Sequence, residues 1–172
     1  MTPFPSSIIR SAVLLSVILM TVIGYAQDSE NIIQAYLNAH QEELGIQESD
    51  YAEWSVSHSY FSESTKVTHV HIKQMVNGLE IENGTANFNL LDGKVFSMGD
   101  RMVRDIYSKA NSPQPILGPE EAIVRAAKQL NIAIQGSIKV LETMSPTEFL
   151  YDKGNFSLED VPVQLVYHST GE

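Results

Sequence analysis

The chain of 172 residues contains no cysteine. This absence excludes disulfide bonds, zinc sites built on thiolates and a lipid attached to a cysteine behind an export signal. No cofactor is expected either, because no phosphate-binding loop or nucleophile–base pairing stands out. Stability must therefore come from a packed core, and the length suffices for one ordinary domain or two very small ones.

Basic residues are scarce in this sequence. There are 11 Lys and Arg against 21 Asp and Glu, a formal net charge of −10. Nucleic acid is therefore not expected as a partner, since its binding depends on Lys and Arg that neutralise phosphates. Anionic membrane surfaces are disfavoured for the same reason. The acidic balance favours solubility and a partner surface that is basic or carries a metal.

No apolar run reaches the roughly 20 residues that a helical membrane span needs. The run from Ala12 to Ile23 has 12 residues, follows the single charge Arg10 and precedes Gly24-Tyr25-Ala26. Small residues three and one positions before Gln27 are typical of a signal-peptide cleavage site. We therefore predict a cleavable signal over residues 1–26 and a secreted or periplasmic protein with no membrane association after cleavage. A retained anchor is the alternative.

The first half of the remaining chain is predicted to form a helix followed by a meander of strands. An amphipathic stripe starts after an N-cap at Asp28 or Ser29 and ends at Gly45; it contains Ile32, Ile33, Tyr36, Leu37 and Leu44. From residue 54 to 103 the period becomes two, with Trp54, Val56 and His58 expected on one face. Three tight turns are predicted, at Asn77-Gly78, Asn83-Gly84 and Asp92-Gly93.

The second half repeats this plan without a matching sequence period. Residues 108–117 are predicted to be a linker, and Pro119 stands at the first position of a second helix, with Glu120 and Glu121 in its first turn. Further strands are expected at Ile138–Leu141, Phe149–Tyr151 and Val163–Tyr167. The fold class is thus α+β, with two small modules, each an antiparallel sheet crossed by one helix.

Two kinds of residue suggest chemistry. His69 and His71 point the same way on one strand and form the best metal candidate, although two ligands alone make a weak site. Adjacent carboxylates suggest acid–base work, but solvated surface explains them better; they are Glu42/Glu43, Glu120/Glu121 and Glu159/Asp160. A polar sheet face is likewise the simpler explanation of the two histidines.

One part of this sequence resembles the pattern of a known family. Residues 68–84 read THVHIKQMVNGLEIENG and lead through Asn87-Phe88-Asn89 to Asp92-Gly93-Lys94-Val95. This pattern is similar to the fungalysin/thermolysin propeptide motif. The helix from Pro119 with its strands resembles the PepSY-like module that follows in such propeptides. The resemblance covers roughly residues 30 to 168.

The resemblance implies a zymogen propeptide: an intramolecular chaperone and temporary inhibitor of a secreted zinc metallopeptidase. It assigns residues 27–107 to the propeptide-motif module and residues 118–172 to a PepSY-like module truncated at its C-terminal end. No His-Glu-x-x-His is present, so the chain is not expected to be an enzyme. It is either a fragment of a peptidase precursor, acting in cis, or a free-standing module acting in trans.

The partner-binding residues expected from this reading are Gln74, Asn77, Gly78 and Asn83. Turn geometry alone also explains Asn77 and Gly78. A free-standing ligand- or metal-binding module that uses His69 and His71 is the alternative function. Finally, the strand Val163–Tyr167 has no evident hairpin partner, so we predict that it lies at a sheet edge with one side unpaired.

Overall fold

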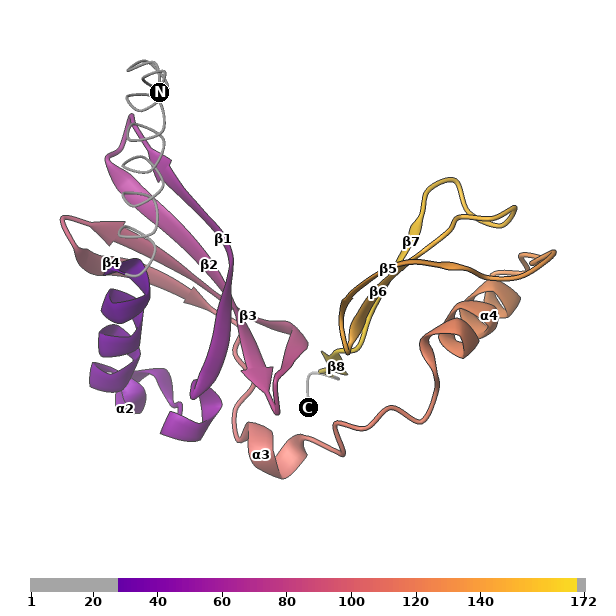
Figure 1. The fold of residues 1–172 in the computed structure, drawn as a ribbon. Coiled ribbons are helices and arrows are strands. Elements are labelled where there is room, and N and C mark those ends of the chain that lie inside the picture. Colours follow the sequence, from indigo (N-terminus) through magenta and orange to yellow (C-terminus); the bar gives the residue numbers. More distant parts are fainter. Residues whose placement is uncertain (1–27, 170–172) are drawn as a thin grey trace, which may run out of the picture.

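The computed structural model describes residues 28–169 (Figure 1). The predicted signal peptide lies outside the described residues. A helix over residues 28–39 is followed by these elements: α2 (Gln41–Leu44), a 3-10 turn η1 (Glu48–Asp50), β1 (Glu53–Ser62), β2 (Val67–Val76), β3 (Leu79–Leu91), β4 (Lys94–Asp100), α3 (Ile106–Lys109), α4 (Pro119–Gln129), β5 (Val140–Ser145), β6 (Glu148–Tyr151), β7 (Val161–Gln164) and β8 (Tyr167–His168).

The strands form two sheets, which confirms the α+β class. The first sheet has the antiparallel order β1-β2-β3-β4, and β8 pairs with β3 off this path. The second sheet has the antiparallel order β5-β6-β7. Figure 1 shows the two sheets side by side, joined by the long connection between α3 and α4.

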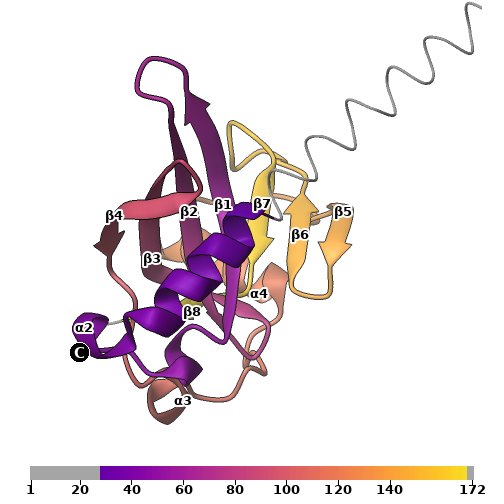
Figure 2. The same cartoon turned by 90° about the vertical axis from the view of Figure 1, so that its left-hand side faces the viewer.

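The helix of residues 28–39 covers one face of the first sheet (Figure 2). Ile33 and Leu37 are fully buried in one core with Val70, Ile72 and Phe88. Each such side chain contributes about 1.5–3 kcal/mol on burial. Asp28 and Ser29 are already helical, so the predicted N-cap is wrong. The helix predicted to run to Gly45 is interrupted at His40; the short helix α2 follows, and Gly45 stops it as a left-handed C-cap at φ 62°.

Two of the three predicted turns are confirmed. Asn77-Gly78 (φ 53° and 74°) and Asp92-Gly93 (φ 49° and 71°) have the positive φ pairs of tight hairpin turns. The turn predicted at Asn83-Gly84 is wrong, since both residues lie inside the continuous strand β3. They belong to a large bulge, across which the register jumps from Lys73↔Thr85 to Met75↔Glu80.

A smaller bulge in β1 changes which face His58 occupies. Val56 is opposite Ile72, yet His58 is opposite His71, so one extra residue, Ser57, is inserted. Trp54 and Val56 therefore share the face of the helix, whereas His58 points to the open face with His71. The predicted common face for Trp54, Val56 and His58 is wrong for this reason.

The second unit follows the predicted order with shifted boundaries. Pro119 stands at the first position of α4, as predicted, behind Gly118 as N-cap. The strand predicted at Val163–Tyr167 is divided: β7 ends at Gln164, and Tyr167 starts β8. Within the described chain β7 pairs with β6 alone, so its predicted edge position is confirmed.

The free edge of β7 is protected by proline. The Leu165 N–H donates to the Thr147 carbonyl at 2.9 Å, so the backbone N–H and C=O groups of Leu165 and Val163 point toward β6. Because these directions alternate along a strand, the backbone groups of Pro162 and Gln164 point to the free edge. Pro162 has no N–H that could donate to a further strand. The edge therefore presents few donors, which reduces the hazard of strand-to-strand association.

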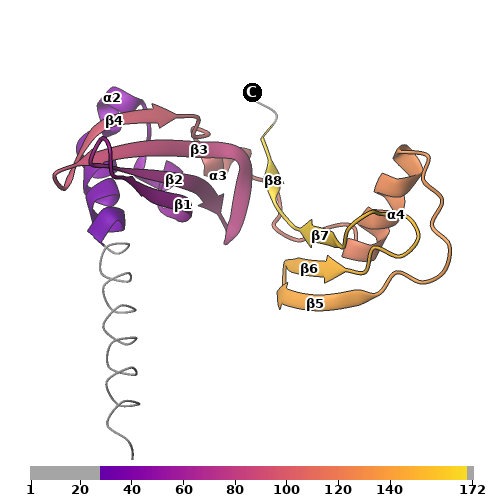
Figure 3. The same cartoon turned by 90° about the horizontal axis from the view of Figure 1, so that it is seen from above.

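The short strand β8 returns the chain to the first sheet (Figure 3). It runs parallel to the bulged part of β3, with Ile81↔Tyr167 and Glu82↔His168 as partners. Tyr167 also packs against the small apolar cluster of Val76, Ile81 and Ile106. The helix α3 begins at the buried Ile106 and ends at Lys109, so it occupies the first two residues of the predicted linker.

Candidate partner-binding surface and the buried Gln74 junction

Gln74 is buried with 0% exposure in β2, although it is a polar residue. Its Nε2 donates to the Asp50 carbonyl at 2.6 Å and to the Val103 carbonyl at 2.7 Å. Its Oε1 accepts the Val103 N–H at 2.8 Å. One side-chain amide thus joins η1, β2 and the segment after β4, and we call this the Gln74 junction.

The bulge in β3 makes room for this amide. A Cβ on Gly84 would lie 2.9 Å from Gln74 Oε1 and 3.0 Å from Ile81 Cβ. Real Cβ atoms essentially never come that close, so only glycine fits. The spacing between Gln74 and Gly84 in the propeptide-like pattern is therefore a packing requirement.

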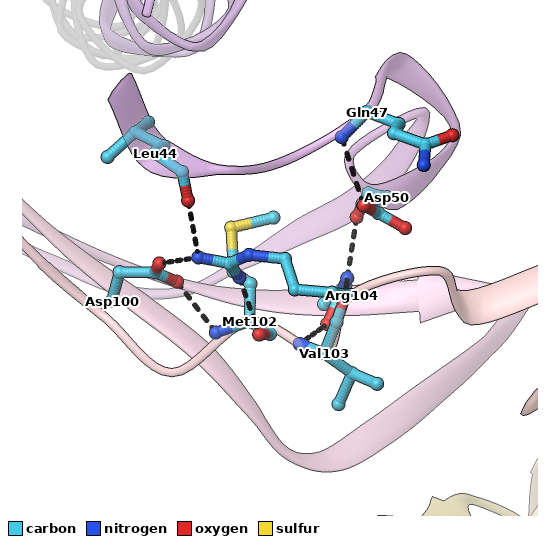
Figure 4. Close-up of polar contacts among 8 residues, drawn as sticks. Leu44, Gln47, Asp50, Asp100, Met102, Val103 and Arg104 are labelled. Carbon is cyan, nitrogen blue, oxygen red and sulfur yellow. Dashed lines mark hydrogen bonds and ion pairs between the residues drawn. The ribbon is translucent and has the colours of Figure 1, made fainter. Parts of the chain in front are cut away.

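Asp50, a residue that is 1% exposed, completes the junction. Figure 4 shows its carboxylate beside Gln47. Its Oδ2 accepts the Gln47 N–H at 3.0 Å and its Oδ1 accepts the Ile106 N–H at 3.1 Å. The same carboxylate therefore fixes the start of η1 and the start of α3. No described buried side-chain nitrogen or oxygen atom lacks a hydrogen-bond partner.

Arg104 fastens the segment after β4 to the end of the N-terminal helical region (Figure 4). Its Nη2 donates to the Leu44 carbonyl at 2.9 Å, and its Nη1 donates to the Met102 carbonyl at 2.6 Å. The guanidinium also forms an ion pair with Asp100, whose Oδ1 accepts the Met102 N–H at 2.7 Å. The planar guanidinium group carries several N–H donors in a fixed geometry, so it can bind two carbonyls and a carboxylate at the same time.

This geometry changes the expected partner-binding surface. Gln74 has no exposed area, and its amide binds three groups of its own chain, so it is not available to a partner. Sequence reasoning missed Asp50 and Arg104, since their roles arise from segments that are far apart in the chain. The Gln47-x-x-Asp50 capping box of η1 was a local signal for Asp50.

The other three expected residues are exposed at one end of the first sheet. Asn77 Nδ2 donates to the Tyr167 hydroxyl at 3.2 Å, and that hydroxyl donates to the Asn111 carbonyl at 2.8 Å. The Gly78 N–H donates to Glu53 Oε2 at 2.8 Å. Asn83 projects from the bulge. The Asn77-Gly78 turn thus contacts β8 and β1 of its own chain, and Tyr167 of β8 contacts the linker.

His69 and His71 lie half-buried on the open face of the first sheet, opposite the helix. His69 Nδ1 is 2.6 Å from Asn89 Oδ1, and its ring stacks on Tyr60 at 4.7 Å. Within residues 28–169 no group of three His, Asp or Glu side chains is placed to hold a metal ion.

An apolar groove of about 400 Å³ separates α4 from β7. Ile123, Ala126, Leu130 and Ile132 line one side, and Val161 to Gln164 line the other. Leu130 is 68% exposed and Ile132 40%. Exposed apolar patches of this kind mark interaction sites in soluble proteins.

Among the described residues, the groups with clearly shifted pKa values are three tyrosines, and each pKa is raised. Burial, and then Glu48, raises the pKa of Tyr51, whose hydroxyl accepts a hydrogen bond from Gln41. Burial, and then Glu120, raises the pKa of Tyr151. Desolvation, and then Glu53, raises the pKa of Tyr107.

The comparisons with known proteins support the family resemblance predicted for the first unit. Residues 52–102 match the Fungalysin/Thermolysin Propeptide Motif. The matched stretch begins just before β1 and ends in the segment that Gln74 binds, so it contains β1 to β4 and their turns. The predicted resemblance to this motif is therefore confirmed, and the PepSY-like nature of the second unit stays a prediction.

Several relatives align over most of the chain. Extracellular metalloproteinase 4 of Arthroderma otae is 29% identical over 123 residues, which are 68% of this chain and 19% of the relative. Extracellular metalloproteinase 2 of Trichophyton rubrum is 30% identical over 59% of this chain and 17% of its own length. Extracellular metalloproteinase 10 of Coccidioides posadasii is 25% identical over 67% and 19%. The chain thus spans about a fifth of the length of these relatives. No helix among the described residues is long and apolar enough to cross a membrane.

Proposed function

We propose that this protein is an exported, non-catalytic propeptide-like module that binds the catalytic domain of a secreted zinc metallopeptidase, assists its folding and inhibits it. The observation that carries the proposal is the propeptide motif over residues 52–102. The alignment with an extracellular metalloproteinase over 68% of the chain but 19% of the relative supports it, because this chain then corresponds to one small part of such a protein.

The shape of the surface supports a protein partner over a small substrate. Exposed apolar side chains gather on the second unit, where the α4–β7 groove is open to solvent. The partner surface that we propose combines this groove with the exposed residues Asn77, Gly78 and Asn83 at the end of the first sheet. With residues 1–26 removed the chain has 10 basic and 21 acidic side chains, a net of −11, which favours a basic partner surface.

A refolding assay tests the proposal. Extracellular metalloproteinase 4 of Arthroderma otae, expressed without the stretch that aligns with this chain, is diluted from denaturant with or without the purified chain. We expect more recovered peptidase activity in its presence, followed by stoichiometric inhibition when more chain is added. The relative's own aligned stretch is the positive control. If that stretch restores activity and this chain neither restores nor inhibits it, the proposal is wrong.

Variants in the groove locate the contact. Leu130→Ser changes a mostly exposed side chain and should leave the unfolding free energy within about 0.5 kcal/mol of the parent, whereas Ile132→Ser, at 40% exposure, should cost about 1 kcal/mol. We expect both to weaken inhibition at least tenfold. Ile116→Ser is the matched control, because Ile116 is 98% exposed in the linker, outside the groove. Equal inhibition by all three variants would remove the groove from the proposed surface.

A further inference from the structure

His58 and His71 form a cross-strand pair on the open face of the first sheet. They are direct partners in the β1–β2 ladder, and their ring centroids are 6.0 Å apart with an interplanar angle of 45°. His58 is exposed and His71 half-buried, so both rings are reachable from solvent. Side chains at directly opposite ladder positions have the shortest distance between strands.

The pair exists because of the bulge at Ser57. Without the extra residue, the alternation of β1 would place His58 on the helix-covered face together with Val56. The Ser57 hydroxyl donates to the His71 carbonyl at 3.1 Å and so fixes the bulge beside the pair. The two imidazoles thus meet through a specific backbone feature.

The surroundings of the pair suit a cation. The ring of Tyr60 lies 5.4 Å from that of His58 and 6.4 Å from that of His71. The neighbouring cation on the same face, Lys73, forms a salt bridge with Glu80 at 2.5 Å. Its charge is therefore offset by a carboxylate and does not oppose a metal ion at the pair.

We propose that His58 and His71 chelate one divalent transition-metal ion, with water in its remaining coordination positions. Imidazole nitrogens bind such ions at about 2.0–2.1 Å, which places the centres of two neighbouring ligating rings roughly 4.5–5.5 Å apart. The observed separation of 6.0 Å is slightly larger, so the rings must approach each other a little to bind one ion, and the exposed His58 side chain has room to move. Imidazole suits copper, nickel and zinc, whereas calcium and magnesium prefer oxygen ligands.

This assignment replaces His69 as the partner of His71. His69 is two residues away on the same strand and is held by Asn89 and Tyr60. The site also differs from a closed structural zinc site, because no third His, Asp or Glu of the described chain joins it. We therefore expect reversible binding that links β1 to β2 and stabilises the fold by mass action.

Calorimetric titration of the untagged chain with Ni²⁺ tests this site. We expect one ion per chain in the parent, no binding of Ca²⁺, and an affinity at least tenfold lower in His58→Ala and in His71→Ala. The double variant should be no weaker than either single variant, because a chelate is lost with its first ligand. His69→Ala is the matched control and should keep the parental affinity.

Two further readouts separate chelation from adventitious binding. Ni²⁺ should raise the melting temperature of the parent and of His69→Ala, but not of His58→Ala. Binding should weaken as the pH is lowered, since protons compete for the imidazole nitrogens. Parental affinity in His58→Ala, or an equal loss in His69→Ala, would overturn the proposal. The titration contains no peptidase, so its failure is independent of the proposed function.

Discussion

Gln74 Oε1 lies where a side chain on Gly84 would have to be, 2.9 Å from the position of its Cβ. The two residues are on neighbouring strands, and the bulge of β3 brings the glycine backbone against the buried amide. Because Gln74 also binds Asp50 and Val103, this contact lies in the interior of the first unit and joins three of its segments.

Gly84→Ala should therefore destabilise the protein by about 1–3 kcal/mol, the usual range for overpacking in a well-packed core. Gly84 does not have a positive φ, so the effect is steric. Gly99→Ala is the control, since its nearest neighbour is 4.0 Å from the added Cβ in the same sheet. Urea unfolding measures both. Equal stability of the two variants would contradict the close approach.

Gln74→Glu should cost about 3 kcal/mol or more at pH 7, because the two carbonyls of Asp50 and Val103 lose their donor and face a carboxylate. The shape of the side chain is unchanged, so the loss reports the amide itself. Gln135→Glu, an exposed position, should change the unfolding free energy by less than about 0.5 kcal/mol. A similar effect at both positions would show that Gln74 is not a buried donor.

Arg104 and Arg125 provide a comparison between two ion pairs of the same i, i+4 spacing. The Arg104–Asp100 side chains are 33% and 18% exposed, whereas the Arg125–Glu121 side chains are 63% and 52% exposed. Arg104→Lys should destabilise by about 1–2 kcal/mol, because the ammonium loses the fork that reaches Leu44 and Met102. Arg125→Lys should change stability by at most about 0.5 kcal/mol. The midpoint of urea unfolding measures the difference, and the reverse order would contradict it.

Stability should fall in alkaline solution partly through Tyr151. Burial raises its pKa in the folded protein above the ordinary value of 10.0, so the folded state keeps the phenol proton longer than the unfolded chain does. The resulting contribution is complete below pH 10 and is lost as the pH rises through the folded pKa. Thermal melts from pH 8 to 11 should show a smaller decline for Tyr151→Phe than for the parent. Identical declines would contradict the raised pKa.

The sequence by itself determined the elements whose signals are local. Tight turns at Asn77-Gly78 and Asp92-Gly93 follow from residues that tolerate positive φ, and the start of α4 follows from Pro119 at its first position. The apolar stripe with Ile33 and Leu37 likewise identified the buried face of the N-terminal helix. The propeptide-like pattern was recognisable because its spacing lies within one meander.

Only the tertiary structure decided what depends on contacts between distant segments. Asn83-Gly84 has the composition of a turn, but the need to accommodate Gln74 makes it a bulge. Ser57 shifts the alternation of β1, so His58 meets His71 instead of the helix. Tyr167 belongs to β8 and not to the strand predicted for it, because it pairs with the bulged part of β3. The hydrophobic period and the residue propensities describe one strand at a time. Bulges and strand pairing depend on the residues of the neighbouring strands, which a local pattern does not contain.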